Sequence, residues 1–219
     1  MTEATGARPA LTRSLFLFSI LYGGMVPLGG FLGAKQVAIG PWLAVEAGIF
    51  PFLTLIAISS AVAEVHGRAV ANQLVRYGFI PLTVAIALAL FVLVLPTDPG
   101  MYEPAKEAFP IIVGQSWRMM AAGIIAYGVS ATLNVWIFSR LSGGLGRMQG
   151  IRSFIAAALS QIVDTLLFIT ISFLGVRPIL DLMVGQMLAK VVLSAVMVPL
   201  IVKLVVAISQ KLDAKGEMA

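Results

Sequence analysis

Six apolar stretches, separated by short polar segments, run through most of the sequence. A transmembrane helix needs roughly 20 consecutive apolar residues to cross the hydrocarbon core of a bilayer. The stretches have about that length, and they predict spans at 13–33, 43–64, 77–96, 118–139, 152–175 and 181–207. In a chain of 219 residues these spans leave room for short loops and for no large soluble domain. We therefore predict one all-α domain, residues 1–219, that crosses a membrane six times.

The composition supports a membrane protein. The chain is 59% hydrophobic and 11% charged, whereas ordinary globular domains are roughly 45–50% apolar and 25% charged. The first apolar stretch is too long for the core of a signal peptide, so we expect it to be retained. The chain has no cysteine, which excludes disulfides and thiolate metal sites. We expect neither a metal ion nor a cofactor.

Basic residues gather on one side of the six-span arrangement. Those on the side of the two termini are Arg8, Arg13, Arg68, Arg76, Arg140, Arg147, Arg152, Lys203, Lys211 and Lys215. The other side carries Lys35, Lys106, Arg118 and Arg177, together with Asp98, Glu103 and Glu107. The positive-inside rule therefore predicts that both termini face the cytoplasm. Because the basic residues are spread over short loops and form no stripe, we expect no nucleic-acid partner.

The segment 96–110 holds four prolines and charges of both signs, so it interrupts the spans and has room for a short interfacial helix. It separates two three-span halves with matching details. Arg13 precedes Tyr22-Gly23 by nine residues and Arg118 precedes Tyr127-Gly128 by nine, while Ser60-to-Glu64 and Ser160-to-Asp164 both have a spacing of four. Two inverted repeats, as in many transporters, would produce these matches. Chance matches in a biased sequence remain the alternative.

Asp164 interrupts the fifth apolar stretch near its middle. A charge at bilayer depth costs roughly 2.5–3.5 kcal/mol on insertion scales, so it usually has a partner, a cavity or a function. Arg177, in the connection to the last span, is thirteen residues from both Asp164 and Lys190. In a helical hairpin, equal distance from the turn gives equal depth. We therefore predict that Asp164 and Lys190 face each other near the midplane.

Other polar side chains share the helix faces of these two charges. Ser160, Gln161 and Phe168 lie at three- and four-residue spacings from Asp164, and Gln186 lies four residues before Lys190. Together they predict a polar patch with an aromatic edge, suited to a polar small-molecule substrate.

Each candidate also has a purely structural interpretation. Asp164 and Lys190 could form only a structural ion pair, and Ser160 and Gln161 could join helices by hydrogen bonds. Asn134 could either pack helices together or contact the substrate. Arg118 could either extend its charged end to the lipid headgroups or bind the substrate, and Glu64 could be either a solvated helix end or a binding residue. Glu46 is expected to be solvated at the opposite interface.

Several segments together resemble the queuosine-precursor transporter family, also called the VUT family. They are AGIFPF at 47–52, AVAEVHG at 61–67, WRMMAAGIIAYGVSATLNVWIFSRL at 117–141, RSFIAAALSQIVDTLLF at 152–168 and GQMLAKVVLSAVMVPL at 185–200. The most specific element is S-Q-x-x-D-T-x-x-F, here Ser160 to Phe168, followed by Lys190. One departure is Ser60, which stands where the family usually has an aspartate four residues before the acid matching Glu64.

The resemblance implies import of a 7-deazaguanine precursor of queuosine across the bacterial inner membrane. A guanine-like edge presents two adjacent donors, which Asp164 could accept in bidentate fashion. Lys190, Gln161, Asn134 or Arg118 could donate to the ring carbonyl, and Phe168 or Trp136 could stack on the ring.

The energy source is left open by the sequence. The chain lacks a G-x-x-x-x-G-K-[ST] loop, so it is not itself a P-loop ATPase. It is either a secondary transporter, with Asp164 or Glu64 as proton carrier, or a substrate-binding subunit, for another vitamin or purine, that needs a separate ATPase. A homodimer is also open. An enzyme is not expected, because the sole histidine, His66, is predicted at an interface and no H-E-x-x-H or G-x-S-x-G motif occurs. A lipid-binding or assembly protein is the remaining alternative.

Overall fold

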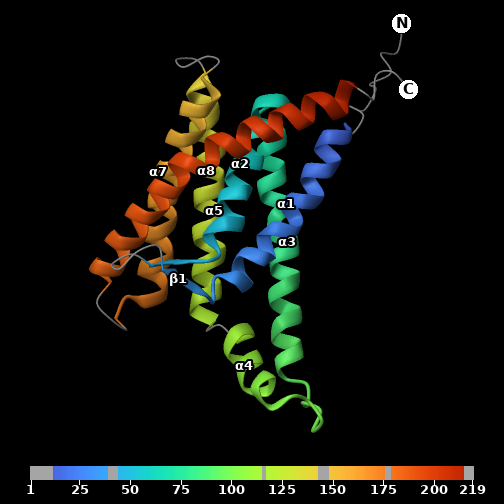
Figure 1. The fold of residues 1–219 in the computed structure, drawn as a ribbon, viewed down its shortest axis with the longest axis vertical. Helices are drawn as coiled ribbons and strands as arrows, with labels where there is room; N and C mark the ends of the chain where they lie inside the picture. Colours follow the sequence, from blue (N-terminus) through green and yellow to red (C-terminus); the bar gives the residue numbers. More distant parts are fainter. Residues whose placement is uncertain (1–11, 39–43, 115–116, 143–147, 176–178, 215–219) are drawn as a thin grey trace, which may run out of the picture.

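The structure is a computed structural model that describes residues 12–38, 44–114, 117–142, 148–175 and 179–214. Its helices form a bundle with a small β-hairpin and a short helix at one end (Figure 1). The elements, in chain order, are α1 (Arg13–Leu32), β1 (Gln36–Ala38), β2 (Ala44–Glu46), α2 (Ile49–Val65), α3 (Arg68–Leu93), α4 (Glu103–Val113), α5 (Trp117–Arg140), α7 (Gln149–Phe173) and α8 (Leu180–Ala214).

Five of the described helices are long and apolar enough to cross a membrane: α1, α3, α5, α7 and α8. The sixth apolar helix, α2, has 17 residues and is shorter. The expectation of a helical, multi-pass membrane protein is therefore confirmed, while a sixth full span remains a prediction.

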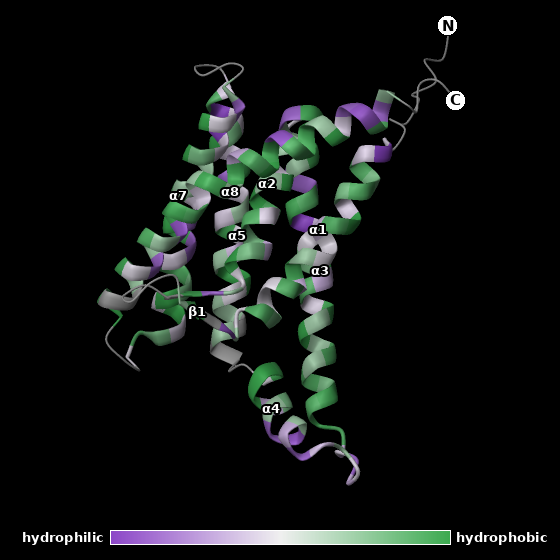
Figure 2. Cartoon of the chain, in the orientation of Figure 1, coloured by the Kyte–Doolittle hydropathy of each residue, from purple (hydrophilic) through white to green (hydrophobic). Residues whose placement is uncertain are grey.

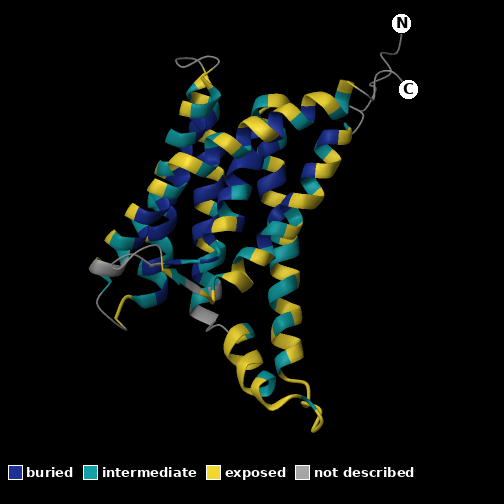
Figure 3. Cartoon of the chain, viewed as in Figure 1, coloured by how far each residue is buried: buried dark blue, intermediate teal, exposed yellow. Residues whose placement is uncertain are grey.

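Helix α2 occupies the centre of the bundle. It packs against α1, α3, α5 and α8, and Figure 3 shows its buried residues inside the ring of longer helices. Most of its residues are buried and apolar, which suits a helix that packs on several sides. The two serines that it does carry, Ser59 and Ser60, are fully buried. This central position lets one face of α2 line an internal cavity.

The outer faces of the bundle are apolar, as a lipid environment requires (Figure 2). On α8 an exposed stripe recurs at every fourth residue: Val184, Leu188, Val192, Val196, Leu200 and Leu204. The opposite face of α8 buries Gln186, Lys190 and Ser194. This arrangement, apolar outside and polar inside, turns the polar groups of the chain toward each other.

The structure corrects two of the predicted helix starts. The span predicted from 43 begins at Ile49, because Ala44–Glu46 pairs with Gln36–Ala38 in an antiparallel hairpin. The span predicted from 77 begins at Arg68, because 68–76 continues the helix and buries Ala71, Leu74 and Val75. Gly67 makes the tight turn before it with φ of 88°, a conformation that favours glycine.

Two further boundaries also changed. The last helix extends to Ala214 instead of 207, and Asp213 near its end accepts hydrogen bonds from Ser14 of α1. The short helix expected within 96–110 is present as α4, which begins at Glu103 and ends at Val113.

The beginning of α1 and the end of α8 lie together at one end of the bundle, opposite the hairpin and α4 (Figure 1). The backbone N–H and Oγ of Ser14 donate to the carboxylate of Asp213 at 3.0 and 2.7 Å. The same Oγ lies 2.9 Å from Nε2 of His66, at the end of α2. These contacts tie the ends of α1, α2 and α8 together. The side of the membrane that this end faces remains a prediction.

The predicted internal repeat remains a prediction. Its two matched tyrosines do meet: the Tyr127 hydroxyl donates to the Tyr22 hydroxyl at 2.8 Å between α5 and α1. However, α2 packs broadly against α8. If the two halves were related, α7 would pack against α3 in the same way, and these two helices make no comparable contact in the described residues.

We predict that Gly78→Ala destabilises the bundle. A Cβ at this position of α3 would lie 2.7 Å from the Tyr127 hydroxyl and 2.9 Å from Cε1 of Tyr22. Overpacking of this kind costs about 1–3 kcal/mol, so the detergent-purified variant should melt at a lower temperature. The control is Gly24→Ala in α1, where an added Cβ meets nothing within 4 Å. Equal melting temperatures for the two variants would contradict the close packing of the tyrosine pair.

Candidate functional site

Within the described residues, α7 carries more of the buried polar groups than any other helix. Ser153, Ser160, Gln161, Asp164 and Thr165 recur at three- and four-residue intervals and are all buried. This spacing places them on one side of the helix. Because α7 packs against both α5 and α8, the polar face looks into the bundle and away from lipid.

Asp164 has two partners on the neighbouring helices. Its Oδ2 accepts a hydrogen bond from Nζ of Lys190 on α8 at 3.3 Å. Its Oδ1 accepts one from Oγ of Ser130 on α5 at 3.1 Å. The carboxylate is 9% exposed and the lysine 6%. The predicted facing of Asp164 and Lys190 is therefore confirmed, and each charge offsets part of the desolvation cost of the other.

The ion pair borders a cavity of about 740 Å³, within the range of roughly 300–1,000 Å³ that small-molecule sites occupy. Its polar wall contains Glu46, Gln161, Asp164, Gln186 and Lys190. The remaining wall is apolar and comes from α1, α2, α3, α4 and α5.

Aromatic side chains form another part of this wall. Phe52, Tyr127, Phe168 and Phe173 all line the cavity. The ring of Tyr127 meets Phe52 and Phe79 edge to face at centroid distances of 6.5 and 5.1 Å. Phe168 and Phe173 make a similar contact at 6.4 Å. Rings beside hydrogen-bonding groups suit a planar polar ligand.

Gln161 is the clearest sign that the cavity receives a ligand. Its side chain is fully buried and lines the cavity, yet neither its amide nitrogen nor its amide oxygen has a hydrogen-bond partner in the described part of the chain. An unpaired buried donor or acceptor costs about 1–3 kcal/mol. A ligand that both accepts and donates a hydrogen bond would remove this cost.

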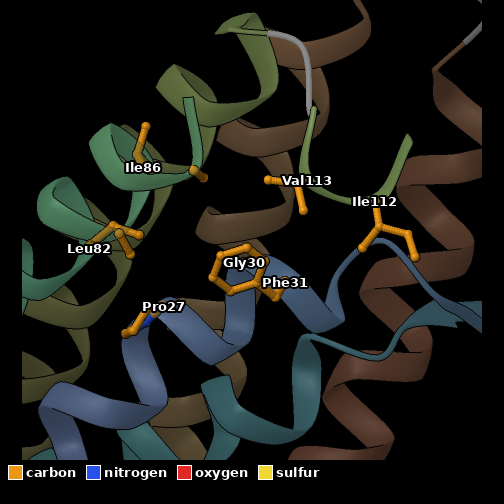
Figure 4. A pocket seen from close by; sticks show the side chains of 9 residues that line it. Pro27, Gly30, Phe31, Leu82, Ile86, Ile112 and Val113 are labelled. Atoms are coloured by element: carbon orange, nitrogen blue, oxygen red, sulfur yellow. The ribbon is translucent and has the colours of Figure 1, made fainter. Parts of the chain in front are cut away.

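A smaller pocket of about 50 Å³ adjoins the cavity (Figure 4). It lies among α1, α3 and α4, and it shares Gly30, Leu82, Ile86 and Ile112 with the cavity. Pro27, Phe31 and Val113 complete its labelled lining. These side chains offer no hydrogen bond, so this pocket extends the apolar wall only.

The structure brings four of the eight predicted site residues to the cavity: Asp164, Gln161, Lys190 and Phe168. Asn134 and Ser160 are buried outside its lining. The amide nitrogen of Asn134 donates to Oγ of Ser59 and Ser60 at 3.2 and 3.1 Å, which joins α5 to α2. Ser160 donates to the Ala157 carbonyl at 3.0 Å. A role for either in substrate binding remains a prediction.

Glu64 lies toward the end of the bundle where α1 begins. Its carboxylate pairs with Arg152 at 2.9 Å and accepts from Gln149 at 3.1 Å, which ties α2 to α7. The helix end is thus paired as well as partly exposed, and a role of Glu64 in binding remains a prediction. The side chain of Arg118 lies outside the described residues, and Trp136, considered for stacking, is 43% exposed on the outside of α5 and does not line the cavity.

The sequence interpretation missed several cavity or site residues. Ser130 precedes Asn134 by four residues, and this spacing could have placed it on the inward face of α5. Tyr127 appeared only in the repeat comparison. Glu46 was expected to be solvated, but the hairpin turns it into the cavity wall. No local sequence pattern predicts that contact, since Glu46 and its partner Gln186 are 140 residues apart.

Comparison with known proteins gives two matches. A family model described as "Putative vitamin uptake transporter" matches residues 46–204. A protein of Bacillus subtilis (strain 168) named "Probable queuosine precursor transporter" is 26% identical over 151 residues, which cover 67% of this chain and 65% of that protein. The chain thus spans somewhat less than two thirds of the length of this relative. No solved structure gives a significant match.

We predict that Asp164 and Lys190 are energetically coupled. Lys190→Met leaves a buried carboxylate without its counter-ion, which typically costs about 3–5 kcal/mol. The double variant Asp164→Asn/Lys190→Met removes both charges, so it should melt closer to the wild type than Lys190→Met does. A double-mutant cycle of melting temperatures measures the coupling.

The matched control is the ion pair of Lys106 and Glu103 on α4, whose glutamate side chain is 76% exposed. Its cycle, with Lys106→Met and Glu103→Gln, should give a coupling below about 1 kcal/mol. If the decreases in melting temperature of the Asp164 and Lys190 single variants add up in the double variant, the buried pair is not coupled.

Proposed function

Because the chain belongs to the family of vitamin uptake transporters that matches residues 46–204, we propose that it imports a 7-deazaguanine precursor of queuosine and binds it in the cavity beside Asp164. Membership of this family supports membrane transport as the activity. The observation that carries the proposed site is the unpaired amide of Gln161, which lies in the same cavity wall as the Asp164–Lys190 pair.

The cavity has the groups that a guanine-like ring requires. An ionised carboxylate accepts hydrogen bonds and donates none, so Asp164 suits the adjacent ring N–H and amino group of a guanine edge. Lys190 and the amide nitrogen of Gln161 can donate to the ring carbonyl next to them. The aromatic side chains, with Phe168 on the same helix face as Asp164, provide surfaces on which the ring can stack.

The named relative supports this substrate class, because it is called a probable queuosine precursor transporter. Ser60 bears on the choice of precursor. Its hydroxyl accepts from Asn134 at 3.1 Å, so a neutral hydrogen-bond network occupies the place where the resembling family usually has an aspartate. If that aspartate contacts the substrate in relatives, this chain will prefer a different member of the precursor class.

We place the chain in the bacterial inner membrane with both termini in the cytoplasm. Support comes from the end of the bundle where α1 begins, because Arg13, Arg68, Arg140 and Arg152 lie in the first or last turns of α1, α3, α5 and α7 at that end. The opposite end carries the acidic residues Asp98, Glu103 and Glu107 around α4. This distribution follows the positive-inside rule.

The mode of energy coupling needs a separate experiment. Purified protein alone in liposomes should take up labelled 7-deazaguanine when a proton gradient is applied if it is a secondary transporter. Uptake only after an ATPase partner is added would instead make the chain a substrate-binding subunit. A homodimer would appear as doubled mass in the purified detergent complex.

We predict that the chain restores queuosine in a strain that cannot make its precursors when 7-deazaguanine precursor is fed. Asp164→Asn should abolish this rescue, because the amide replaces one acceptor oxygen by a donor against the guanine edge. The readout is the fraction of modified transfer RNA, measured alongside the amount of protein in the membrane.

The control is Asp98→Asn, the same chemical change in the exposed segment before α4. It should leave rescue at the wild-type level. Full rescue by Asp164→Asn at normal membrane levels would remove Asp164 from the site while leaving transport itself intact. Absence of rescue by the wild-type chain, together with no binding of any 7-deazaguanine, would overturn the proposed substrate class.

A further inference from the structure

The cavity has a second polar position, built from Gln186 on α8 and Glu46 on β2. The amide nitrogen of Gln186 donates to Oε1 of Glu46 at 3.4 Å. The Gln186 side chain is 2% exposed, and both residues line the cavity. The amide oxygen of Gln186 is buried and has no hydrogen-bond partner in the described part of the chain.

The chemistry of Glu46 fixes which way the Gln186 amide points. An ionised carboxylate only accepts hydrogen bonds, whereas an amide group has a donating end and an accepting end. The nitrogen of Gln186 must therefore face Glu46, which leaves the oxygen as the free end. A rotation of the amide by 180° would place two oxygens against each other. Gln186 consequently has an unpaired acceptor, its amide oxygen, while its nitrogen is held by Glu46.

This position is distinct from Asp164 but close to it. Gln186 and Lys190 are four residues apart on α8, so their side chains begin about 5–6 Å from each other on one helix face. That separation is about the width of a small fused ring. A ligand whose polar edge contacts Asp164 and Lys190 would thus reach Gln186 with another part of its structure.

We propose that Gln186, held in orientation by Glu46, selects substrates that present a hydrogen-bond donor at the end away from Asp164. Gln186 is the specificity-determining contact and Glu46 is a positioning residue. This inference rests on the proposed function, since it assumes that the cavity binds the transported molecule. It adds a second requirement to that of a guanine-like ring: the substrate must also carry a substituent with an O–H or N–H group.

The test uses three neutral 7-deazaguanines with the same ring. One is unsubstituted, one carries a hydroxymethyl group at position 7, which donates a hydrogen bond, and one carries a nitrile there, which only accepts. Position 7 lies on the five-membered ring, away from the edge proposed for Asp164. Affinities are measured by calorimetry on the purified wild type and on Glu46→Gln and Gln186→Leu.

The wild type should bind the hydroxymethyl compound about tenfold more tightly than the nitrile compound. In Glu46→Gln the new amide can both donate and accept, so the Gln186 amide can rotate and the preference should fall to within about twofold. Gln186→Leu should lose the same preference. The preference is the ratio of two affinities measured on the same protein, so a general loss of structure, which weakens both compounds alike, leaves that ratio unchanged.

The matched control is Glu107→Gln, the same change on the exposed surface of α4, and it should keep the wild-type preference. A wild type without preference, or a preference that survives in Glu46→Gln, would overturn the role of Gln186 while leaving the proposed substrate class in place. If Gln186→Leu does not fold, the Glu46→Gln result decides alone. Failure of the wild type to bind any of the three rings would instead reject the proposed function, and this inference with it.

Discussion

The ion pair between Asp164 and Lys190 is the interaction on which the inner structure of the bundle depends. Neither charge would be stable alone at this depth, because lipid and packed side chains solvate charges poorly. Their contact at 3.3 Å fixes α7 against α8, and the bond from Ser130 extends the same group to α5. Three helices are thereby held around one carboxylate, and the cavity begins at its surface.

The lipid-facing surfaces and the polar interior follow from the same constraint. Every fourth residue of α8 from Val184 to Leu204 is apolar and exposed, which leaves Gln186, Lys190 and Ser194 on the inner face. The face of α7 that contains Asp164 is polar because it, too, points into the bundle and away from lipid. The lipid environment therefore determines which face of each outer helix is apolar, and the central helix α2 buries most of its apolar residues against its neighbours.

The sequence predicted those features that depend on local spacing. The facing of Asp164 and Lys190 followed from a count of residues to the turn, and the shared face of Gln161 and Phe168 followed from helical periodicity. The features that it missed depend on contacts between distant segments. Ser130 reaches Asp164 across 34 residues and Gln186 reaches Glu46 across 140. The start of α3 was missed for another reason: Arg68 and Arg76 look like loop residues, yet the helix continues through them and buries the apolar residues between.

The two ends of the bundle differ in a way that bears on transport. At the end where α1 begins, polar contacts join the helices: Ser14 binds Asp213 and His66, and Glu64 binds Arg152. The cavity is lined from the other end, by Glu46 of the hairpin and by Ile111 and Ile112 of α4. A substrate that leaves past the first end must separate those contacts. Hydrogen bonds to charged groups, such as those of Asp213 and Glu64, contribute about 1.5–3 kcal/mol net each. Separation of Glu64 from the buried Arg152 would leave a buried charge without its counter-ion, and so would separation of Lys190 from Asp164. The end where α1 begins is thus joined by charged contacts, whereas the cavity wall at the other end includes Glu46 and apolar side chains of α4.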